Sequence, residues 1–344
     1  MNFFKKMALI ARGLVSVICG WVIYSITQKT PSKSHRDLIH LFCLSGGACN
    51  DVFAWLISKT SRSLFLPDGN GVLGNLDDSD VSEIVSQLEE KGYAVFESVL
   101  DVDSLSNLMQ FALTTPATVR RMDDQMEGET QNAVLYNPKE PRAVTYDFKT
   151  SDILKSAEVQ KLLADKSIIQ IAAKYLQCVP LADVTAMWWT TNFKAAADGA
   201  AAQLYHFDMD RIKWLKVFVY VTDVGVKDGP HSFIEGSHRT GGIPSHMLQK
   251  GYTRLTDSEV RSYYSSEREK RFAAPRGTII IEDTRGLHKG NPVELDGKPR
   301  LILQFQFSNS LFGANYAKHT FGNTICPSLR RLISLEKKIY ANYL

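Results

Sequence analysis

Two residues near the middle of the chain have the types and the spacing of adjacent metal ligands. In the segment 203–208 (QLYHFD), His206 and Asp208 are two positions apart. On an extended strand such residues project from the same face, whereas Phe207 between them points to the other face. An imidazole and a carboxylate on one face can bind one metal ion. The tripeptide alone is common by chance, and a hydrogen-bonded pair at a strand edge is the plainer interpretation.

A second histidine follows a predicted strand. Residues 277–283 (GTIIIED) are rich in isoleucine, residues 284–287 form a turn, and His288 comes next. Two histidines and one carboxylate are typical of the facial triad of non-haem Fe(II) oxygenases, which leaves positions open for a bidentate co-substrate and O₂. Four cysteines or a fourth histidine would favour structural zinc instead.

An arginine completes this pattern. Arg300 lies 12 residues after His288 and opens the predicted strand 300–307. A buried guanidinium beside a metal requires an anion. A dicarboxylate that binds the metal at one end could pair bidentately with the arginine at the other. Taken alone, an arginine at the start of a strand is as often a surface residue.

The run from residue 203 to residue 300 resembles the phytanoyl-CoA dioxygenase family of Fe(II)- and 2-oxoglutarate-dependent oxygenases. The resemblance covers about residues 90–307 and begins at 91–96 (KGYAVF), which is similar to the family's opening strand. It includes 228–230 (DGP) and 235–239 (EGSHR), which are similar to the family's NGP and PGSH stretches. The resemblance implies a double-stranded β-helix, or jelly roll, with helices packed on one sheet.

The resemblance also implies an activity and a set of ligands. His206, Asp208 and His288 would bind Fe(II), and Arg300 would take the distal carboxylate of 2-oxoglutarate. The expected enzyme is a dioxygenase that uses O₂ to hydroxylate an unidentified small-molecule, lipid or carrier-linked substrate, with release of succinate and CO₂. The intact Asp208 favours hydroxylation, because related halogenases carry a small residue at this position.

Other positions of the resemblance are less direct. Met187 and Phe218 fall where the family lines the 2-oxoglutarate pocket, although both are equally explained as core residues. The family often has Ser or Thr two positions after the distal histidine, to donate to the co-substrate, but here the residue is Gly290. Glu235 replaces the family's Pro before Gly-Ser-His, which concerns a turn. Gly290 favours the alternative function, a non-catalytic jelly-roll binding module with a vestigial metal site.

The composition excludes several classes of protein. The chain has 344 residues, of which 44% are hydrophobic and 22% charged, and this excludes disordered, collagen-like and coiled-coil proteins. The formal net charge of +3 without a long basic run argues against a nucleic-acid partner. The five cysteines are scattered and form no CxxC pair, which favours reduced thiols in the cytoplasm over a disulfide framework.

The first 65 residues are predicted to form a helical extension, separated from a dioxygenase domain at 66–344 by the turn-rich segment 66–71. Residues 7–26 are largely apolar, but the uninterrupted stretch Gly13–Ile26 has only 14 residues. A bilayer-spanning helix requires about 20. A helix in peripheral contact with a membrane and a helix packed on the domain are equally favoured, and a true span less so. No small-residue cleavage site follows, as a signal peptide would require.

Helices and strands are expected in separate parts of the remaining chain. Residues 38–42 and 52–57 are expected in helices joined by a Gly46-Gly47 turn, and the stretch 122–149 is expected to be irregular. Beyond residue 185, several short strands indicate a sandwich or barrel rather than βαβ units. The other expected helices are 80–91, 103–113, 158–176 and 328–340, and the expected strands are 93–96, 185–192, 204–208, 214–222, 277–282 and 300–307.

Overall fold

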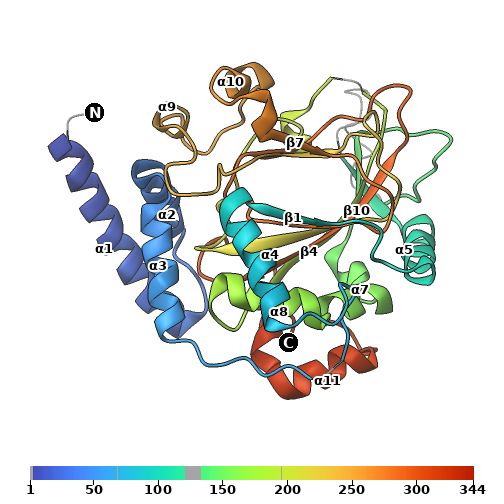
Figure 1. Ribbon diagram of the computed structural model, residues 1–344, viewed down its shortest axis with the longest axis horizontal. Coiled ribbons are helices and arrows are strands. Elements are labelled where there is room, and N and C mark those ends of the chain that lie inside the picture. Colours follow the sequence, from blue (N-terminus) through green and yellow to red (C-terminus); the bar gives the residue numbers. More distant parts are fainter. Residues whose placement is uncertain (1–2, 68, 121–132, 195) are drawn as a thin grey trace.

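The computed structural model describes residues 3–67, 69–120, 133–194 and 196–344. Antiparallel strands form two sheets, and helices cover the larger one (Figure 1). The larger sheet has the strand order β1-β8-β5-β10-β4-β3-β2, and the smaller has the order β7-β6-β9. This architecture confirms the predicted fold class, a jelly-roll core with flanking helices and a helical N-terminal extension.

The strands lie mainly in the second half of the chain. Their bounds are β1 Tyr93–Phe96, β2 Ala117–Arg120, β3 Thr145–Phe148, β4 Leu181–Thr190, β5 Trp214–Tyr220, β6 His231–Ile234, β7 Glu269–Phe272, β8 Ile279–Glu282, β9 His288–Gly290 and β10 Arg300–Ser308. The predicted strands at 93–96, 185–192, 214–222, 277–282 and 300–307 correspond to β1, β4, β5, β8 and β10 and are confirmed, with small differences at their ends.

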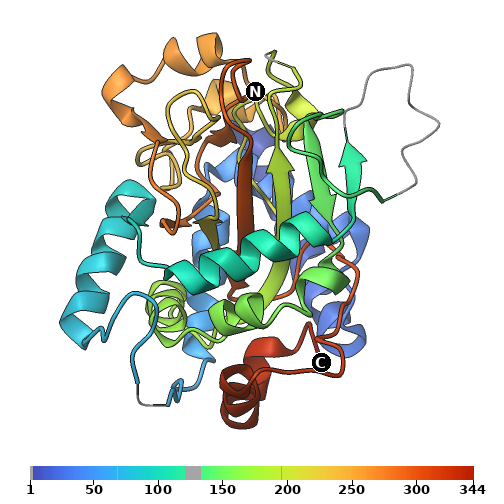
Figure 2. The ribbon, with the colours of Figure 1, turned by 90° about the vertical axis from the view of Figure 1, so that its right-hand side faces the viewer.

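The helices precede the strands, surround them or close the chain. Their bounds are α1 Phe3–Thr27, α2 Ser32–Ser45, α3 Ala48–Lys59, α4 Asp78–Lys91, α5 Val102–Thr114, α6 Thr150–Ile153, α7 Ala157–Leu163, α8 Lys166–Leu176, α9 Ser245–Leu248, α10 Asp257–Arg261 and α11 Pro327–Glu336. Figure 2 views the end of the molecule opposite α1, with α5 nearest the reader.

The central strands separate two apolar regions. In β5, Val217 and Val219 belong to the main core, which the helices cover, whereas Phe218 and Tyr220 belong to a cluster between the sheets. All seven residues of β5 are buried. Because both faces of this strand are covered, its sequence is a nearly continuous apolar run rather than an alternating one.

Two predicted helices have different limits in the structure. The helix expected at 80–91 begins at Asp78, because the Asp77 side chain accepts from Ser79 N and Asp80 N and caps it. Such caps stabilise a helix by about 1 kcal/mol. The single helix expected at 158–176 is wrong: α7 ends at Leu163, and Asp165 caps α8 by accepting from Ile168 N at 3.1 Å.

Other differences concern segments without regular structure. The predicted strand 204–208 consists of two isolated bridges, Tyr205 with Leu255 and His206 with His288. Part of the stretch expected to be irregular, residues 122–132, lies outside the described residues, and β3 is a regular strand within the remainder. The final predicted helix is α11 followed by the 3₁₀ turn Lys337–Tyr340.

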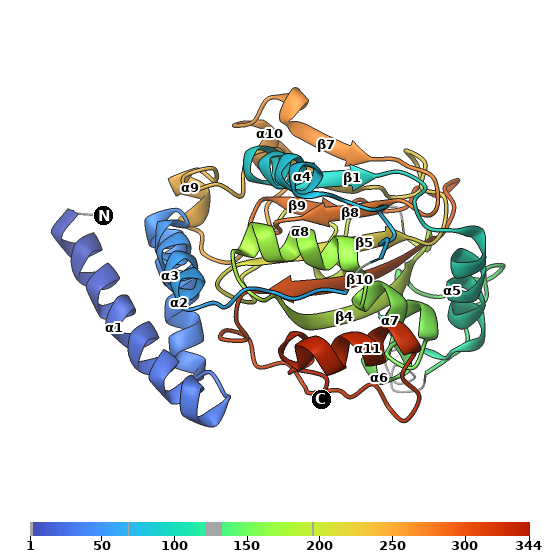
Figure 3. The same ribbon diagram turned by 60° about the horizontal axis from the view of Figure 1, so that its bottom comes forward.

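The first three helices form a layer at one end of the molecule, with α1 outermost (Figures 1 and 3). The turn between α2 and α3 uses Gly46 and Gly47 at φ of 64° and 96°, which confirms the predicted glycine turn and explains it, since L-residues rarely adopt these angles. The layer contacts the segment that follows β4: His35 Nε2 lies 3.0 Å from the Met209 carbonyl, and Asn50 Nδ2 donates to the Ile212 carbonyl at 3.1 Å.

Candidate metal centre

A backbone bridge brings the two candidate histidine ligands together. His206 N donates to the His288 carbonyl at 3.0 Å, and His288 N donates to the His206 carbonyl at 2.9 Å. Directly opposed residues that exchange both bonds hold their side chains on the same side of a ladder. Residues 82 positions apart therefore present their imidazoles side by side, with ring centroids 4.3 Å apart.

The turn before His288 is held by a buried ion pair and a glycine. Arg285 Nη2 lies 2.7 Å from Asp283 Oδ2, and Tyr175 donates to the same carboxylate at 2.6 Å. A Cβ at Gly286 would lie 2.5 Å from the Phe233 ring. A larger residue at position 286 would therefore displace the turn that delivers His288.

The three candidate ligands form one buried group. The nearest ligand atoms of His206, Asp208 and His288 all lie within 4.8 Å of one another. His206 Nδ1 lies 2.9 Å from the Leu204 carbonyl and His288 Nδ1 lies 3.0 Å from the Gly286 carbonyl. Because a carbonyl only accepts, each Nδ1 carries a proton, and Nε2 is the nitrogen of each ring that is left for the centre.

The charges of these groups suit a divalent cation. Burial, followed by the charge of His288, lowers the pKa of His206 well below its usual value, so this imidazole is neutral. Burial alone would raise the pKa of Asp208, but Lys216 and His288 outweigh it and keep this pKa well below its usual value. The centre thus contains a permanent carboxylate beside imidazole nitrogens, a donor set that fits Fe(II).

A lysine holds this carboxylate from the side of β5. Lys216 Nζ lies 2.5 Å from Asp208 Oδ2 and 3.4 Å from Asp210 Oδ2. Asp208 N also donates to the Thr284 carbonyl at 2.8 Å. The side chain and the backbone of Asp208 are therefore both held by contacts within the protein.

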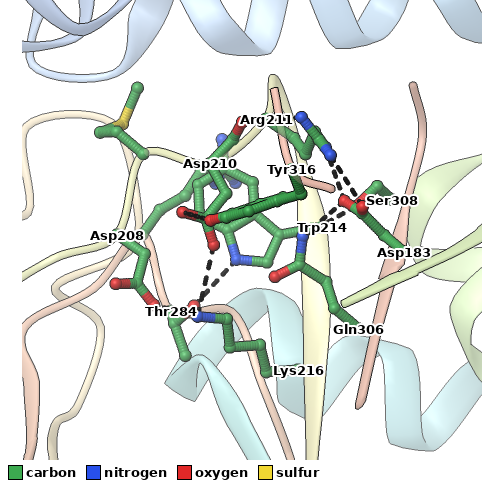
Figure 4. A network of polar contacts seen from close by, with 12 residues as sticks. Asp183, Asp208, Asp210, Arg211, Trp214, Lys216, Thr284, Gln306, Ser308 and Tyr316 are labelled. Carbon is green, nitrogen blue, oxygen red and sulfur yellow. Dashed lines mark hydrogen bonds and ion pairs between the residues drawn. The ribbon is translucent and has the colours of Figure 1, made fainter. Parts of the chain in front are cut away.

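The lysine is part of a polar network that extends to β4 and β10 (Figure 4). The Tyr316 hydroxyl donates to Asp210 at 2.7 Å, and its ring lies 5.1 Å from the Arg211 guanidinium. Arg211 forms a bidentate ion pair with Asp183 of β4, at 2.5 and 2.7 Å. Gln306 of β10 donates to the same Asp183 carboxylate. These contacts hold the segment that contains both ligands at 206 and 208.

Arg300 presents unpaired donors to the same pocket. Within the described residues, its Nε and Nη1 atoms have no hydrogen-bond partner although they are buried, and Nη2 lies 3.4 Å from Thr190 Oγ1. Buried unpaired guanidinium donors are costly without an anion. A carboxylate, such as the distal one of 2-oxoglutarate, would supply an acceptor for these donors. A Cβ at Gly290 would lie 3.1 Å from Arg300 Nη2, so the glycine leaves this guanidinium room.

The pocket has a volume of about 340 Å³ and includes the three candidate ligands, Arg300 and Phe218. The structure places Met187 elsewhere. On β4 the pocket is lined by Ala186 and Trp188, whereas Met187 between them points to the opposite face and lies in the main core. The alternation of side chains along a strand therefore removes Met187 from the pocket lining.

Lys216 is a candidate functional residue that the sequence interpretation missed. Its signal was a single charged residue inside the otherwise apolar strand WLKVFVY. A lysine is almost never fully buried unless it is paired. Only the tertiary structure shows that its partners are Asp208 and Asp210.

Comparison with known proteins gives one family. Residues 88–299 match the family described as phytanoyl-CoA dioxygenase (PhyH). No curated protein matches the chain.

Solved structures show distant likenesses. AviO1 from Streptomyces viridochromogenes Tue57 is 16% identical, with 68% of this chain and 96% of that chain covered and a TM-score of 0.43. EctD from S. alaskensis with bound Fe is 18% identical, with 75% and 85% covered and a TM-score of 0.43. HygX from Streptomyces hygroscopicus, with nickel, 2-oxoglutarate and hygromycin B bound, is 13% identical, with 67% and 88% covered and a TM-score of 0.44.

Proposed function

The chain belongs to the phytanoyl-CoA dioxygenase family, and on that premise we propose that it hydroxylates a small molecule at the centre formed by His206, Asp208, His288 and Arg300. It is an oxygenase-type enzyme whose cofactors are Fe(II) and 2-oxoglutarate. When bound, these cofactors supply the oxidation of a substrate C–H bond by O₂, with release of succinate and CO₂. The observation that carries the proposal is a His-Asp-His group in the same pocket as an arginine with two unpaired donors.

Each residue of the centre has a distinct role in this proposal. The imidazoles of His206 and His288 would bind the metal through Nε2, because their Nδ1 atoms are engaged by backbone carbonyls. Asp208 supplies the negative charge, and Lys216 fixes the orientation of its carboxylate. Arg300 binds and orients the co-substrate, while Phe218 and Trp188 exclude water from the pocket.

We propose the kind of substrate from the residues at the mouth of the pocket. Arg254 lines the pocket and donates to the Gly199 carbonyl at 3.1 Å. Arg120 also lines it and pairs with Asp147. The volume suits a co-substrate together with only part of a second molecule. A lipid or a carrier-linked substrate would therefore insert its reacting part, and Arg254 would meet an anionic group outside.

The binding-module alternative rested on Gly290. In the structure this glycine lies beside the Arg300 guanidinium, where a serine or threonine side chain would press against it. The glycine is therefore compatible with a co-substrate site, and Thr190 Oγ1 provides a hydroxyl near the guanidinium instead.

The proposal is tested by anaerobic addition of Fe(II) and 2-oxoglutarate to the purified protein. We expect a weak visible metal-to-ligand charge-transfer band, lost in His288→Ala and weakened in Arg300→Ala. The matched control is Arg261→Ala, which removes a surface arginine that pairs with Glu269. This variant should retain the band. Absence of a band from folded protein with excess iron would contradict the proposed site.

We also propose a cytoplasmic location, consistent with five free cysteines. The division into an extension at 1–65 and a catalytic domain at 66–344 is a proposal as well. Contact of residues 7–26 with a membrane is a separate proposal that does not depend on the catalytic one.

A further inference from the structure

The outward face of α1 is apolar along its length. The side chains on this face recur every three or four residues and are all exposed. They belong to Ala8, Ala11, Val15, Cys19, Val22 and Ile26. Val15, Val22 and Ile26 have exposed fractions of 62%, 56% and 79%. On a helix that covers a soluble domain, this face normally carries polar and charged side chains. A helix that is apolar on two opposite faces requires a partner on both of them.

The inward face of α1 is already occupied, so its orientation is defined. A Cβ at Gly13 would lie 2.9 Å from Leu41 of α2, and a Cβ at Gly20 would lie 2.2 Å from Ser34. Val17 between the two glycines is 1% exposed, and Ser34 Oγ donates to the Ser16 carbonyl at 2.9 Å. Two glycines thus allow α1 to pack closely on α2, and the opposite face is left to the surroundings.

The apolar surface continues from α1 onto α3. Val52, Trp55 and Leu56 of α3 are exposed by 57%, 55% and 49%. Between the two helices lies an apolar groove of about 340 Å³, lined on one side by Val22 of α1 and on the other by Leu56. We call the outward face of α1, this groove and the exposed side chains of α3 the docking face. Figures 1 and 3 both place α1 and α3 at the end of the molecule opposite α5.

The charges around the docking face are mainly positive. Residues 1–65, which include α1 and α3, contain eight lysines and arginines and two acidic residues, Asp37 and Asp51, a net charge of +6. Since the whole chain has a formal charge of +3, the remaining residues together carry −3. The positive charge of the protein is therefore concentrated on the segment that also exposes its apolar side chains. Such a combination is complementary to an anionic lipid surface.

We propose that the docking face binds an anionic phospholipid bilayer, with α1 lying in the plane of the interface. The most apolar window of the stretch Phe4–Thr27 has a mean hydropathy of 1.9, and only 17% of it is buried. The core helix of a soluble protein would be mostly buried. A transmembrane orientation would require α1 to leave α2, with loss of the contacts at Gly13 and Gly20. Interfacial binding keeps these contacts and covers the opposite face.

The experiment is co-sedimentation of the full-length protein with vesicles. We expect binding to phosphatidylcholine vesicles that contain 30% phosphatidylglycerol, and weaker binding to phosphatidylcholine alone or in high salt. Brominated acyl chains should quench the fluorescence of Trp55, identified by comparison with Trp55→Phe. The double variant Val15→Glu/Val22→Glu should lower the partition coefficient by at least about tenfold, because two inserted valines become charged.

A matched control uses exposed apolar residues outside the docking face. Val226 and Leu295 are exposed by 75% and 70%. The double variant Val226→Glu/Leu295→Glu adds the same charge and should leave the partition coefficient unchanged. Thermal unfolding of both double variants checks that they are folded.

Four results would overturn the proposal. The first is wild-type protein that does not bind anionic vesicles, and the second is an equal loss of binding in the control variant. The third is a dimer, observed without lipid, that Val15→Glu/Val22→Glu converts to a monomer, because a second copy would then cover the face. The fourth is protein from cells whose first residue lies beyond Thr27, which would identify α1 as a cleaved signal.

Discussion

The pocket of the candidate metal centre and the docking face distribute polarity in opposite ways. In the pocket, Asp208, Lys216 and Arg300 are charged and have exposed fractions of 7%, 8% and 3%. On α1, Val15 and Ile26 are apolar and exposed by 62% and 79%. Each region departs from the usual rule that charge lies outside and apolar groups inside. The comparison teaches that such a departure marks a surface that requires a partner.

The two regions differ in how far contacts within the chain offset the free-energy cost of buried charge or exposed apolar surface. Asp208 is paired with Lys216, so most of the cost of burying the carboxylate is offset within the chain. The unpaired Nε and Nη1 of Arg300 are offset only by a ligand. Nothing in the described residues covers the outward face of α1. Contacts within the protein therefore hold the pocket residues in position for a ligand. Among the described residues, the apolar side chains of the docking face have no such contacts and are left for a partner to cover.

The largest expected effect comes from removal of the buried carboxylate. Asp208→Ala should lower Fe(II) affinity by more than about 100-fold, because changes in groups that merely support metal ligands already cost 10–100-fold. Succinate formation that depends on 2-oxoglutarate should be lost. Anaerobic Fe(II) titration measures the first effect. The control is Asp296→Asn, which changes an exposed carboxylate paired with Lys227. Full activity of Asp208→Ala would contradict the ligand assignment.

Removal of the unpaired guanidinium should separate co-substrate binding from metal binding. Arg300→Gln should raise the KM for 2-oxoglutarate by about 100-fold, since truncating one partner of a buried charge pair costs 2–5 kcal/mol. Fe(II) affinity should stay within about twofold, because Arg300 does not contact the candidate ligands. Equal losses of both affinities would contradict this division of roles.

Neutralisation of the lysine tests whether preorganisation of Asp208 matters. Lys216→Met should lower Fe(II) affinity by about 10- to 100-fold, in the range found for groups that orient metal ligands. The binding constant of the metal is the readout, measured in the absence of turnover. Lys213→Met is the matched control, because Lys213 is a nearby lysine whose ammonium packs on Tyr175 instead.

The ion pair that joins the two regions has a predictable pH dependence. Burial alone would raise the pKa of Asp283, but Arg285 lowers it to about 2, and Arg285 also pairs with Asp51 of α3 at 2.8 Å. A lowered pKa contributes stability that is present above the unfolded pKa of 3.8 and is lost as pH falls through about 2. In urea unfolding, the free energy of unfolding should fall by about 2 kcal/mol between pH 5 and pH 2 because of this group. Asp283→Asn should remove this contribution from the pH dependence.

The smallest expected effect is that of a charge on the outward face of α1, compared with the same charge on its inward face. Val17→Glu introduces a charge at a position that is 1% exposed and should lower the free energy of unfolding by about 2–3 kcal/mol. Val15→Glu introduces the same charge on the exposed face and should change the free energy of unfolding by less than about 0.5 kcal/mol. Equal losses in denaturant unfolding would mean that the outward face of α1 is covered by protein in solution.

Prediction from sequence succeeded where spacing along the chain carries the chemistry. His206 and Asp208 are neighbours on one extended segment, so their proximity needs no knowledge of the fold. Met187 and Trp188 could not be separated in this way, because a shift of one residue in register exchanges the two faces of β4. The break between α7 and α8 was missed because the apolar pattern continues across it, and only the cap at Asp165 marks it.

The sequence by itself determined the family, the jelly-roll class and the residues that are candidates for the metal and the co-substrate, since these follow from residue types at short spacings. The tertiary structure alone decided that His288 pairs with His206, that Lys216 holds Asp208, and that Gly290 leaves room for Arg300. It also decided which face of α1 is outward. The physical reason is that contacts between distant segments depend on strand register and helix packing, which local patterns do not specify.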